Sequence, residues 1–409
     1  MLISYIGLSH LSLNYSAASL KMGHHVQILD TRIIVDQFKK KELNFYEPGL
    51  NETLDRYSKK INYDFDFKKL TKSDLIFIGV DVITNAQNKV IYDRLDNLIS
   101  STLKHLKGSK IPLIIMSQVE PGYTRKIKYN QKFLYHYVET LIFGKALERA
   151  VNPERIIIGK INSNHKPQLK LRKYLKEFKC ELIEMKFEES ELTKAFINIY
   201  LASQLATTNN LANLATSMNA SWKVIRKALI LDKRIGEYSY TFPGLGIAGG
   251  NIERDIKTLK DLSLKQFVKK NYFQYLIGDN LYFKNWLFRK ISSYDYRDKK
   301  IAILGVTYKE DTLSCKNAPS LELIKNLKLE NLLLHDRRAS DLALPKKIID
   351  RFFDLNTILN TSEILVILHN IDLYKKINLK NKKVSLVIDP FNILKIKINS
   401  KISQICISN

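Results

Sequence analysis

Short apolar runs alternate with segments of helical periodicity along much of the chain. Residues 2–8 form a mainly apolar run with Gly7 near its end, and a helical pattern covers about residues 13–22. A second apolar run, residues 25–30, ends in Asp30. A strand, a glycine turn, a helix and a strand that ends in an acid about twenty residues later are typical of a dinucleotide-binding unit. The sequence therefore predicts a doubly wound α/β domain at the amino-terminal end.

The periodicity changes twice further along the chain. A helical pattern begins near Glu189 and long helices continue to Ile291, and apolar strand runs return from Asp298 onward. We therefore expect an α/β fold with two doubly wound Rossmann-like domains joined by a central region of long helices. The expected domains are residues 1–188, 189–297 and 298–409.

Composition narrows the class of protein. A length of 409 residues favours two or three domains, and 45% hydrophobic residues are typical of a globular chain. The longest apolar run, residues 111–116, is too short to span a bilayer, and no secretion signal is recognised, so we expect a cytoplasmic protein with no membrane partner. Three dispersed cysteines and eight histidines without ligand spacing predict no metal site.

The strong positive charge permits a second interpretation. A net charge of +25 is compatible with nucleic-acid binding, but the lysines are scattered and the one dense run is Lys39–Lys41. We therefore expect no nucleic-acid partner. The positive field would favour an anionic substrate.

The stretch from Phe242 to Asp255 suits neither a helix nor a strand interior, because it holds four glycines within seven positions. Such a loop lets backbone approach a ligand closely. The stretch resembles the active-site signature of the UDP-glucose/GDP-mannose dehydrogenase family, P-G-x-G-F-G-G-S-C-x-x-K-D, in which the Cys is the covalent nucleophile. Arg254 stands for the Lys of that signature, and Asn251 falls at the position of the Cys. The matching residues are Pro243, Gly244, Gly246, Gly249 and Asp255.

The resemblance continues in order through the chain. Residues 191–202 resemble E-L-x-K-x-x-x-N-x-x-L-A, residues 232–236 resemble D-x-R-I-G, and residues 305–309 resemble G-L-A-F-K. It implies that Lys194, Asn198 and Asp255 stabilise charge and handle protons, with Glu139 in acid/base steps. It also implies a substrate-binding set, with Arg234 reaching the substrate of a partner subunit: Arg234, Gly246, Gly249, Gly250 and Lys309.

The resemblance implies NAD as the cofactor, and Asp30 suits a ribose diol, which favours NAD over NADP. The implied cofactor-binding residues are Gly7, Ser9, Leu11, Asp30, Gln118 and Lys316. Several positions depart from the family pattern. Ser9 and Ser12 replace two glycines of G-x-G-x-x-G, Phe143 replaces a second acid, and Lys316 replaces an Arg.

We therefore expect NAD-dependent oxidation of the C6 alcohol of a nucleotide sugar, UDP-glucose-like, in nucleotide-sugar or polysaccharide metabolism. The resemblance also implies a homodimer formed through the central helices. An amide cannot act as the nucleophile, so with Asn251 the second oxidation by the covalent route should fail. Three outcomes then stay open: the reaction stops at the aldehyde, it uses the aldehyde hydrate for the second step, or the protein acts on a different sugar. The alternative is a catalytically inactive homologue that binds a nucleotide sugar or a partner subunit.

Overall fold

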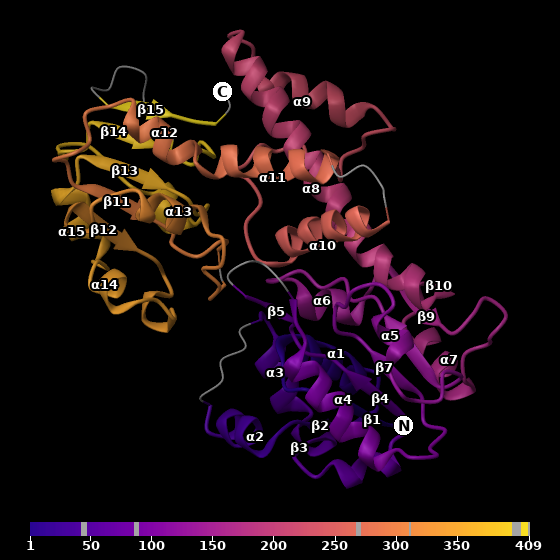
Figure 1. Ribbon diagram of the computed structural model, residues 1–409. Helices are drawn as coiled ribbons and strands as arrows, with labels where there is room; N and C mark the ends of the chain where they lie inside the picture. The colour runs from indigo at the N-terminus through magenta and orange to yellow at the C-terminus, as the bar shows by residue number, and fades with distance from the viewer. Residues whose placement is uncertain (42–46, 86–89, 267–270, 311, 395–401, 408–409) are drawn as a thin grey trace. The chain divides into compact units, whose positions relative to one another are not determined.

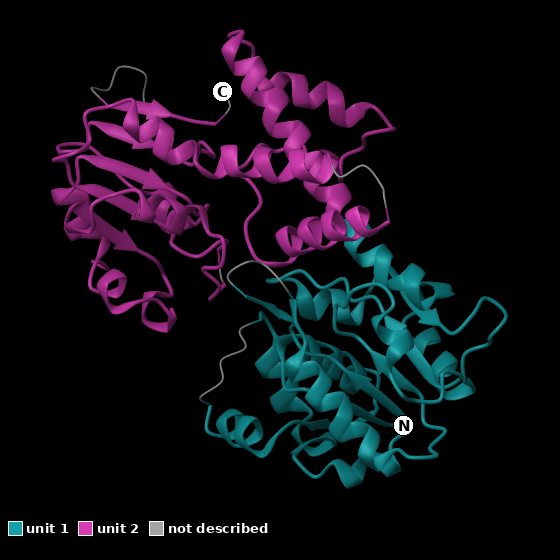
Figure 2. Cartoon of the chain, viewed as in Figure 1, with its two compact units in different colours: residues 1–197 teal, residues 198–409 magenta. Residues whose placement is uncertain are grey.

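The computed structural model of the chain (Figure 1) describes residues 1–41, 47–85, 90–266, 271–310, 312–394 and 402–407. Its internal contacts divide the chain into two compact units (Figure 2). We call Met1–Ile197 unit 1 and Asn198–Asn409 unit 2.

Unit 1 is built on an eight-stranded sheet in the spatial order β10-β9-β8-β7-β4-β1-β2-β3. The strands from β3 to β8 pair in parallel, and β9 joins β8 in the antiparallel direction. The parallel part has the strand order of a dinucleotide-binding fold. The strands are β1 (Leu2–Ile6), β2 (His25–Leu29), β3 (Ile61–Asp64), β4 (Leu75–Ile78), β7 (Leu113–Ile115), β8 (Leu134–Tyr137), β9 (Arg155–Lys160) and β10 (Glu181–Lys186), with a small β5 (Ile83–Thr84) and β6 (Val90–Ile91) hairpin apart from the sheet.

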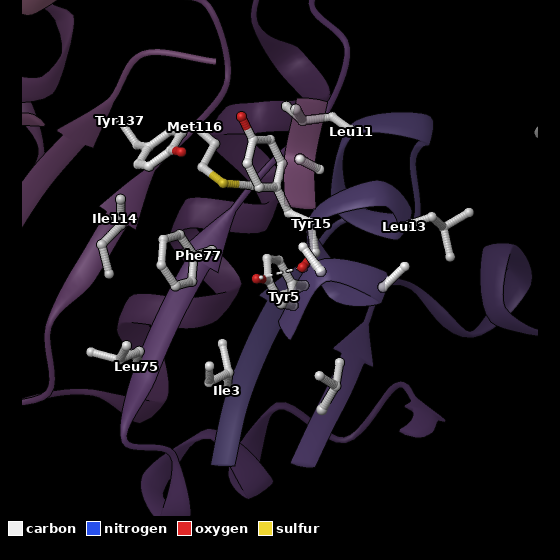
Figure 3. Close-up of a cluster of buried hydrophobic side chains, with 14 of the residues drawn as sticks. Ile3, Tyr5, Leu11, Leu13, Tyr15, Leu75, Phe77, Ile114, Met116 and Tyr137 are labelled. Carbon is white, nitrogen blue, oxygen red and sulfur yellow. Dashed lines mark hydrogen bonds between the residues drawn. The ribbon is translucent and has the colours of Figure 1, made fainter. Parts of the chain in front are cut away.

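Both faces of this sheet are buried, which explains why its central strands are apolar throughout. Successive residues point to opposite faces, so Tyr5 belongs to one apolar cluster and Ile6 to another. Figure 3 shows the first cluster, where the stacked rings of Tyr5 and Phe77 lie 5.3 Å apart. The helices are α1 (His10–Lys21), α2 (Arg32–Lys39), α3 (Leu50–Arg56), α4 (Asp93–His105), α5 (Tyr123–Lys126), α6 (Ala146–Val151) and α7 (Leu169–Lys176), with 3-10 turns η1 (Ser58–Lys60) and η2 (Phe67–Lys72).

A helix of 31 residues, α8 (Phe187–Ser217), begins in unit 1 and continues into unit 2. Unit 2 adds further helices and a five-stranded parallel sheet in the order β12-β11-β13-β14-β15, the second common order of doubly wound folds. The elements are α9 (Trp222–Leu231), α10 (Asn251–Lys265), α11 (Asn271–Lys284), α12 (Trp286–Ser292), β11 (Ile301–Leu304), α13 (Pro319–Lys325), η3 (Leu329–Asn331), β12 (Leu332–His335), η4 (Ala339–Asp341), α14 (Lys346–Ile349), α15 (Leu355–Thr361), β13 (Ile364–Ile367), α16 (Asp372–Lys375), β14 (Leu386–Ile388) and β15 (Ser403–Ile405).

The predicted fold class is confirmed: two doubly wound sheets are connected by long helices. The predicted start of the first helix, near Leu13, was wrong by about one turn, because Ser9 caps a helix that begins at His10. Strands β3, β5, β6, β8 and β15 were not predicted. Across the described residues, no helix combines the length and apolar character needed to cross a membrane.

Candidate active site

The glycine turn after β1 is shaped by its contact with the end of β4. Gly7 has a φ of +97°, and a Cβ on it would lie 2.3 Å from Val80 Cγ1, so no other residue fits there without a shift. Ser9 and Ser12, at the positions of the two missing glycines, each donate a hydroxyl hydrogen bond of 2.7 Å to the carbonyl of Gly79. Both serines are buried. Their side chains therefore point into the fold and do not project toward a ligand at the turn.

Ser9 has a second role, because its hydroxyl oxygen accepts the backbone N–H of Ser12 at 3.1 Å and so caps α1. Leu11 lies in the apolar core of unit 1, so a contact of this residue with a cofactor would come from its backbone. The turn thus keeps the arrangement in which a strand leads through glycine to a helix amino terminus, where phosphate groups bind.

Asp30, at the end of β2, faces this turn. One of its oxygens accepts the backbone N–H of Leu8 at 2.6 Å and the guanidinium of Arg94 at 2.8 Å, and the other accepts the N–H of Thr31 at 2.8 Å. The carboxylate is only 1% exposed, because Arg94 from α4 covers it. Arg94 was not predicted as a site residue, because it lies 64 residues away from Asp30 in the sequence.

A small pocket of unit 1 brings three of the predicted site residues together with a buried acid: Gln118, Glu139, Lys194 and Glu191 all line it. The ammonium of Lys194 lies 2.8 Å from Glu139, and both side chains are largely buried. Glu139 also accepts the N–H of Leu141 at 3.0 Å, which fixes the carboxylate. A buried ion pair of this kind presents both an acid and a base to a bound alcohol.

Two buried titratable residues of this pocket were not predicted. Burial raises the pKa of Glu191, whose carboxylate accepts the N–H of Thr124 at 2.8 Å and so holds the turn that follows Gln118. Burial lowers the pKa of His136 to about 4, and its Nδ1 lies 2.8 Å from the Ser190 hydroxyl. Glu191 stands three residues before Lys194 in α8, so helical spacing could have revealed it.

Phe143, at the position of the family's second acid, stacks on the ring of His10 with ring centroids 4.6 Å apart. The Nε2 of His10 lies 2.9 Å from Glu47. Glu47 is buried and also accepts the N–H of Ala146 at 2.7 Å. An aromatic and acidic cluster therefore occupies the place where the family pattern has a carboxylate.

In unit 2, the side-chain amide of Asn198 donates a hydrogen bond of 2.6 Å to Asp255, and both residues are buried. The Nε of Arg254 lies 3.2 Å from the other oxygen of Asp255. A buried carboxylate is stable only when it is paired and hydrogen-bonded. These contacts therefore hold Asp255 in one place on α10.

The glycine loop before α10 is held by two asparagine side chains. Asn209 Oδ1 accepts the N–H of Gly244 at 2.7 Å, and Asn280 Oδ1 accepts the N–H of Ile247 at 2.5 Å. Gly246 has a φ of +80°, and a Cβ on it would lie 2.7 Å from Asn280 Oδ1. The spacing of glycines in the sequence therefore reflects the close approach of α11 to the loop.

Asn251 is the first residue of α10 and is exposed. Neither Cys180 nor Cys315 is suited to replace the missing nucleophile. Burial raises the pKa of Cys315 to about 11 and also raises the pKa of Cys180, so both stay protonated at neutral pH.

The loop after β11 contacts the glycine loop. The N–H of Gly249 donates to the carbonyl of Lys316 at 3.1 Å, and a Cβ on Gly250 would lie 3.4 Å from Lys316 Nζ. Lys309 is exposed on the same loop, where its carbonyl accepts the hydroxyl of Thr307 at 2.9 Å. Lys316, which the sequence analysis assigned to the cofactor, thus lies beside the predicted substrate loop.

The turn at Gly305 repeats the geometry of the turn at Gly7, with the same φ of +97°. The N–H of Val306 donates to Asp336 at 2.8 Å, as the N–H of Leu8 donates to Asp30. Each unit therefore has a glycine turn that is hydrogen-bonded to an aspartate at the end of the adjacent strand.

Arg234 lies just beyond α9. Its side chain is 88% exposed and pairs with Asp232. This exposure is compatible with a contact to a second chain.

Comparisons with known proteins give a consistent result. The chain is 27% identical over 348 residues to UDP-glucose 6-dehydrogenase of Rickettsia bellii. This match covers 80% of this chain and 78% of the relative. It is similar in fold to a UDP-glucose dehydrogenase structure from Pyrobaculum islandicum, with a TM-score of 0.81, 21% identity and coverage of 95% and 93% of the two chains. A UDP-D-ManNAc dehydrogenase structure from Pyrococcus horikoshii is also similar in fold, with a TM-score of 0.82 and 18% identity. The comparison covers 100% of this chain and 99% of that structure's chain.

Three family models match consecutive parts of the sequence. The NAD binding domain matches residues 1–178, the central domain residues 188–280 and the UDP binding domain residues 302–396. The residues at the glycine turn of unit 1 fit the cofactor that the first model implies, because Gly7 keeps the tight turn and the two serines point inward. The chain belongs to the UDP-glucose/GDP-mannose dehydrogenase family.

Proposed function

We propose that this protein oxidises the C6 alcohol of a UDP-sugar, with NAD as the hydride acceptor, and releases the aldehyde. The observation that carries the proposal is the buried hydrogen bond between Asn198 and Asp255. This bond joins α8 to α10, the helix whose first residue is Asn251. The proton-handling groups of the family signature are thus kept in an ordered arrangement, while the nucleophile is absent.

The protein's own residues have distinct roles in this reaction. Lys194 and Glu139 form the ion pair that would exchange a proton with the sugar alcohol. An amide has two N–H donors, and the bond to Asp255 uses one donor of Asn198, so the other can stabilise a developing oxyanion. Lys309 is an exposed cation on the loop that would meet the nucleotide phosphates.

The NAD-binding residues would be the turn at Gly7, the amino terminus of α1 and Asp30. The cofactor supplies the hydride acceptor when it is bound. Because Arg94 covers the Asp30 carboxylate, we expect Arg94 to move or to share the ribose hydroxyls with it.

The second oxidation needs a covalent adduct with the aldehyde. Asn251 has no nucleophilic atom, and Cys315 is protonated at neutral pH because burial raises its pKa. We therefore expect one hydride transfer for each sugar molecule. A cysteine at the same position would stand at the amino terminus of α10, where the helix dipole favours a thiolate.

The test is the amount of NADH formed for each UDP-glucose consumed, measured with a carbonyl trap and with UDP- and GDP-sugars in parallel. The wild type should form one NADH and a trapped aldehyde. Asn251→Cys should form two NADH and a uronate, and Asn251→Ser is the control that changes the residue without adding a thiol. Two NADH from the wild type would refute the proposed stopping point.

We also propose a homodimer. Helix α8 carries exposed apolar residues spaced 11, 14 and 18 positions after Tyr200, which places them along one stripe of the helix. They are Tyr200, Leu211 and Leu214, together with Met218 directly after the helix, and α9 adds the exposed Val224 and Leu231. A soluble monomer rarely exposes such a continuous patch, so a second copy is the proposed occupant. In the dimer, Arg234 would reach the substrate bound by the partner subunit.

The alternative, an inactive homologue that binds a nucleotide sugar, is favoured by one observation. The contact of Phe143 with His10 puts an aromatic pair where the family pattern has a catalytic acid. Thermal stabilisation by UDP-glucose without stabilisation by NAD, together with no NADH, would establish this alternative. For the boundaries, we propose residues 1–188, 189–297 and 298–409 as the three functional domains of a cytoplasmic protein.

A further inference from the structure

The carboxylate of Asp30, at the end of β2, is closed off from solvent by three hydrogen bonds. Its Oδ2 accepts the N–H of Leu8 at 2.6 Å and a guanidinium N–H of Arg94 at 2.8 Å, and its Oδ1 accepts the N–H of Thr31 at 2.8 Å. The side chain of Asp30 is only 1% exposed, whereas that of Arg94 is 47% exposed. A ligand that approaches the end of β2 therefore meets a cation before it meets the acid.

Arg94 is held over Asp30 by one nitrogen of its guanidinium. Nη2 makes the bond to Asp30 and also donates to the carbonyl of Leu8 at 3.2 Å. A guanidinium carries five N–H donors in a rigid planar fork, and it can bind phosphate through two parallel N–H groups. Arg94 can therefore receive an anionic ligand through its other nitrogens while its contact with Asp30 persists.

A second cation lies at the start of α2, two residues after Asp30. Arg32 is exposed, and its guanidinium lies 4.1 Å from the centroid of the Phe65 ring. Stacking engages the flat face of a guanidinium and keeps its N–H donors at the edge. The first turn of α2 contains no acid, and Thr31 before it is exposed and makes no side-chain capping bond. An arginine, a hydroxyl and a helix amino terminus are all groups that bind phosphate.

The acids around this end of the sheet do not oppose an anion there. Asp30 and Arg94 together carry no net charge. Asp64, at the end of β3, is paired with Lys69, and Asp66 caps η2 by accepting the N–H of Lys68 at 3.0 Å. Asp36 lies one turn further along α2, away from its amino-terminal end. The charge of Arg32 is therefore a local positive surplus.

A dinucleotide-binding fold selects its cofactor at this place. An acid after the second strand hydrogen-bonds the ribose 2′-hydroxyl of NAD, and a nearby arginine accommodates the 2′-phosphate of NADP. This chain has both groups and pairs them with each other. We propose that the protein binds NADP as well as NAD, with the 2′-phosphate held by Arg94 and Arg32, so that Arg94 determines the cofactor selectivity. The inference goes beyond the proposed function, which assigns NAD alone.

The two cofactors make different demands on the ion pair. NAD needs Arg94 to move from Asp30 or to share the ribose hydroxyls with it. NADP leaves the pair intact and adds a charge-assisted contact to the guanidinium. The selectivity against NADP that Asp30 alone would give is therefore removed by Arg94.

The test measures binding to the full-length protein by calorimetry, without a nucleotide sugar. The probes are NADH and NADPH, and the smaller pair AMP and adenosine 2′,5′-bisphosphate, which differ only in the 2′-phosphate. We expect NADPH to bind at least as tightly as NADH, and the bisphosphate to bind at least about tenfold more tightly than AMP. Arg94→Gln should weaken NADPH about 10–100-fold and change NADH by less than about threefold.

The control is Arg155→Gln, which removes the same charge elsewhere in unit 1. Arg155 begins β9, is 33% exposed and pairs with Glu154 at 3.1 Å, and its loss should leave the ratio of NADPH to NADH affinity unchanged. Because the test compares two ligands on one variant, a merely structural role of Arg94 would weaken both equally and would overturn the inference. If Arg94→Gln fails to fold, the preference of the wild type for the bisphosphate over AMP still decides.

A preference of the wild type for NADH of more than about tenfold would also overturn the inference and would leave the proposed function standing. Failure to bind either dinucleotide would reject both. Tight NADPH binding without oxidation of UDP-glucose would retain the 2′-phosphate site and reject the proposed dehydrogenase activity.

Discussion

Gly79 lies directly after β4 and accepts the hydroxyls of both Ser9 and Ser12. A Cβ on Gly79 would lie 2.9 Å from Ser12 Oγ and 2.9 Å from Met116 Cε. Its φ is outside the left-handed region, so an alanine there would be opposed by these contacts and not by its backbone conformation. The glycines lost from the turn are thus matched by a glycine in the neighbouring strand end.

We predict that Gly79→Ala destabilises unit 1. The end of the Met116 side chain can rotate away, but Ser12 is fixed in α1 by its hydrogen bonds. Overpacking of this kind costs about 1–3 kcal/mol. For a unit of this size, each kcal/mol lowers the unfolding midpoint by about 2–4 °C, so we expect a decrease of roughly 2–12 °C.

A double-mutant cycle tests the reason for this loss. Ser12→Ala alone removes one hydrogen bond, worth about 0.5–1.5 kcal/mol. In the Gly79→Ala protein the same change also removes the clashing oxygen, so the two effects should be coupled by about 1 kcal/mol or more. Thermal unfolding of the full-length variants, followed by calorimetry, measures both. Additive effects would refute the reasoning. The control is Gly278→Ala in α11, where a Cβ meets nothing within 4 Å and should stabilise the helix by about 1 kcal/mol.

Three further predictions concern titration, chemistry and assembly. Burial lowers the pKa of His136 to about 4. Between about pH 6.5 and 4, the unfolded chain therefore binds a proton that the folded chain does not. Up to about 3 kcal/mol of the free energy of unfolding is lost as the pH falls through this window. His136→Asn should flatten the dependence of the unfolding midpoint on pH between 7 and 4.5, and an unchanged slope would assign it to other groups. Lys194→Gln removes the partner of Glu139 and should lower the rate of NADH formation about 10²–10⁴-fold, with UDP-glucose binding retained in calorimetry; a change in binding alone would contradict the proton-transfer role. If the proposed dimer forms through the apolar stripe of α8, Leu214→Glu should give a monomer in light scattering, because it places a charge on that stripe. The same change at the exposed Leu169 of α7 should leave the dimer intact.

The order of the elements was predictable because the central strands are buried on both faces and therefore apolar throughout. β1 and β4 are buried from their second residue or earlier to their end. β8 is equally buried, but its four residues are Leu, Tyr, His and Tyr, which do not form an aliphatic run. Its position became clear only from its pairing with β7, which brings together segments about twenty residues apart.

The predicted site residues were identified by their chemical type, but their partners come from distant segments. Arg94 reaches Asp30 from α4, and Asn280 reaches the glycine loop from α11. Arginine and asparagine are common on exposed helix faces, so no sequence pattern distinguishes these two residues from the others. The inward direction of the Ser9 and Ser12 hydroxyls likewise depends on Gly79, which is about seventy residues away.

Two departures from the family signature share a structural feature that bears on function. Ser9 and Ser12 are matched by Gly79, and Asn251 follows a glycine against which Lys316 lies. In both cases an absent side chain on one residue makes room for a specific atom of another. A protein that had stopped binding a cofactor would not need its turn at Gly7 to stay tight, since a larger residue there could be accommodated by shifting a loop with no ligand to hold. The close fit at these two places is what a retained ligand site requires, and it therefore supports the proposed function over the inactive alternative.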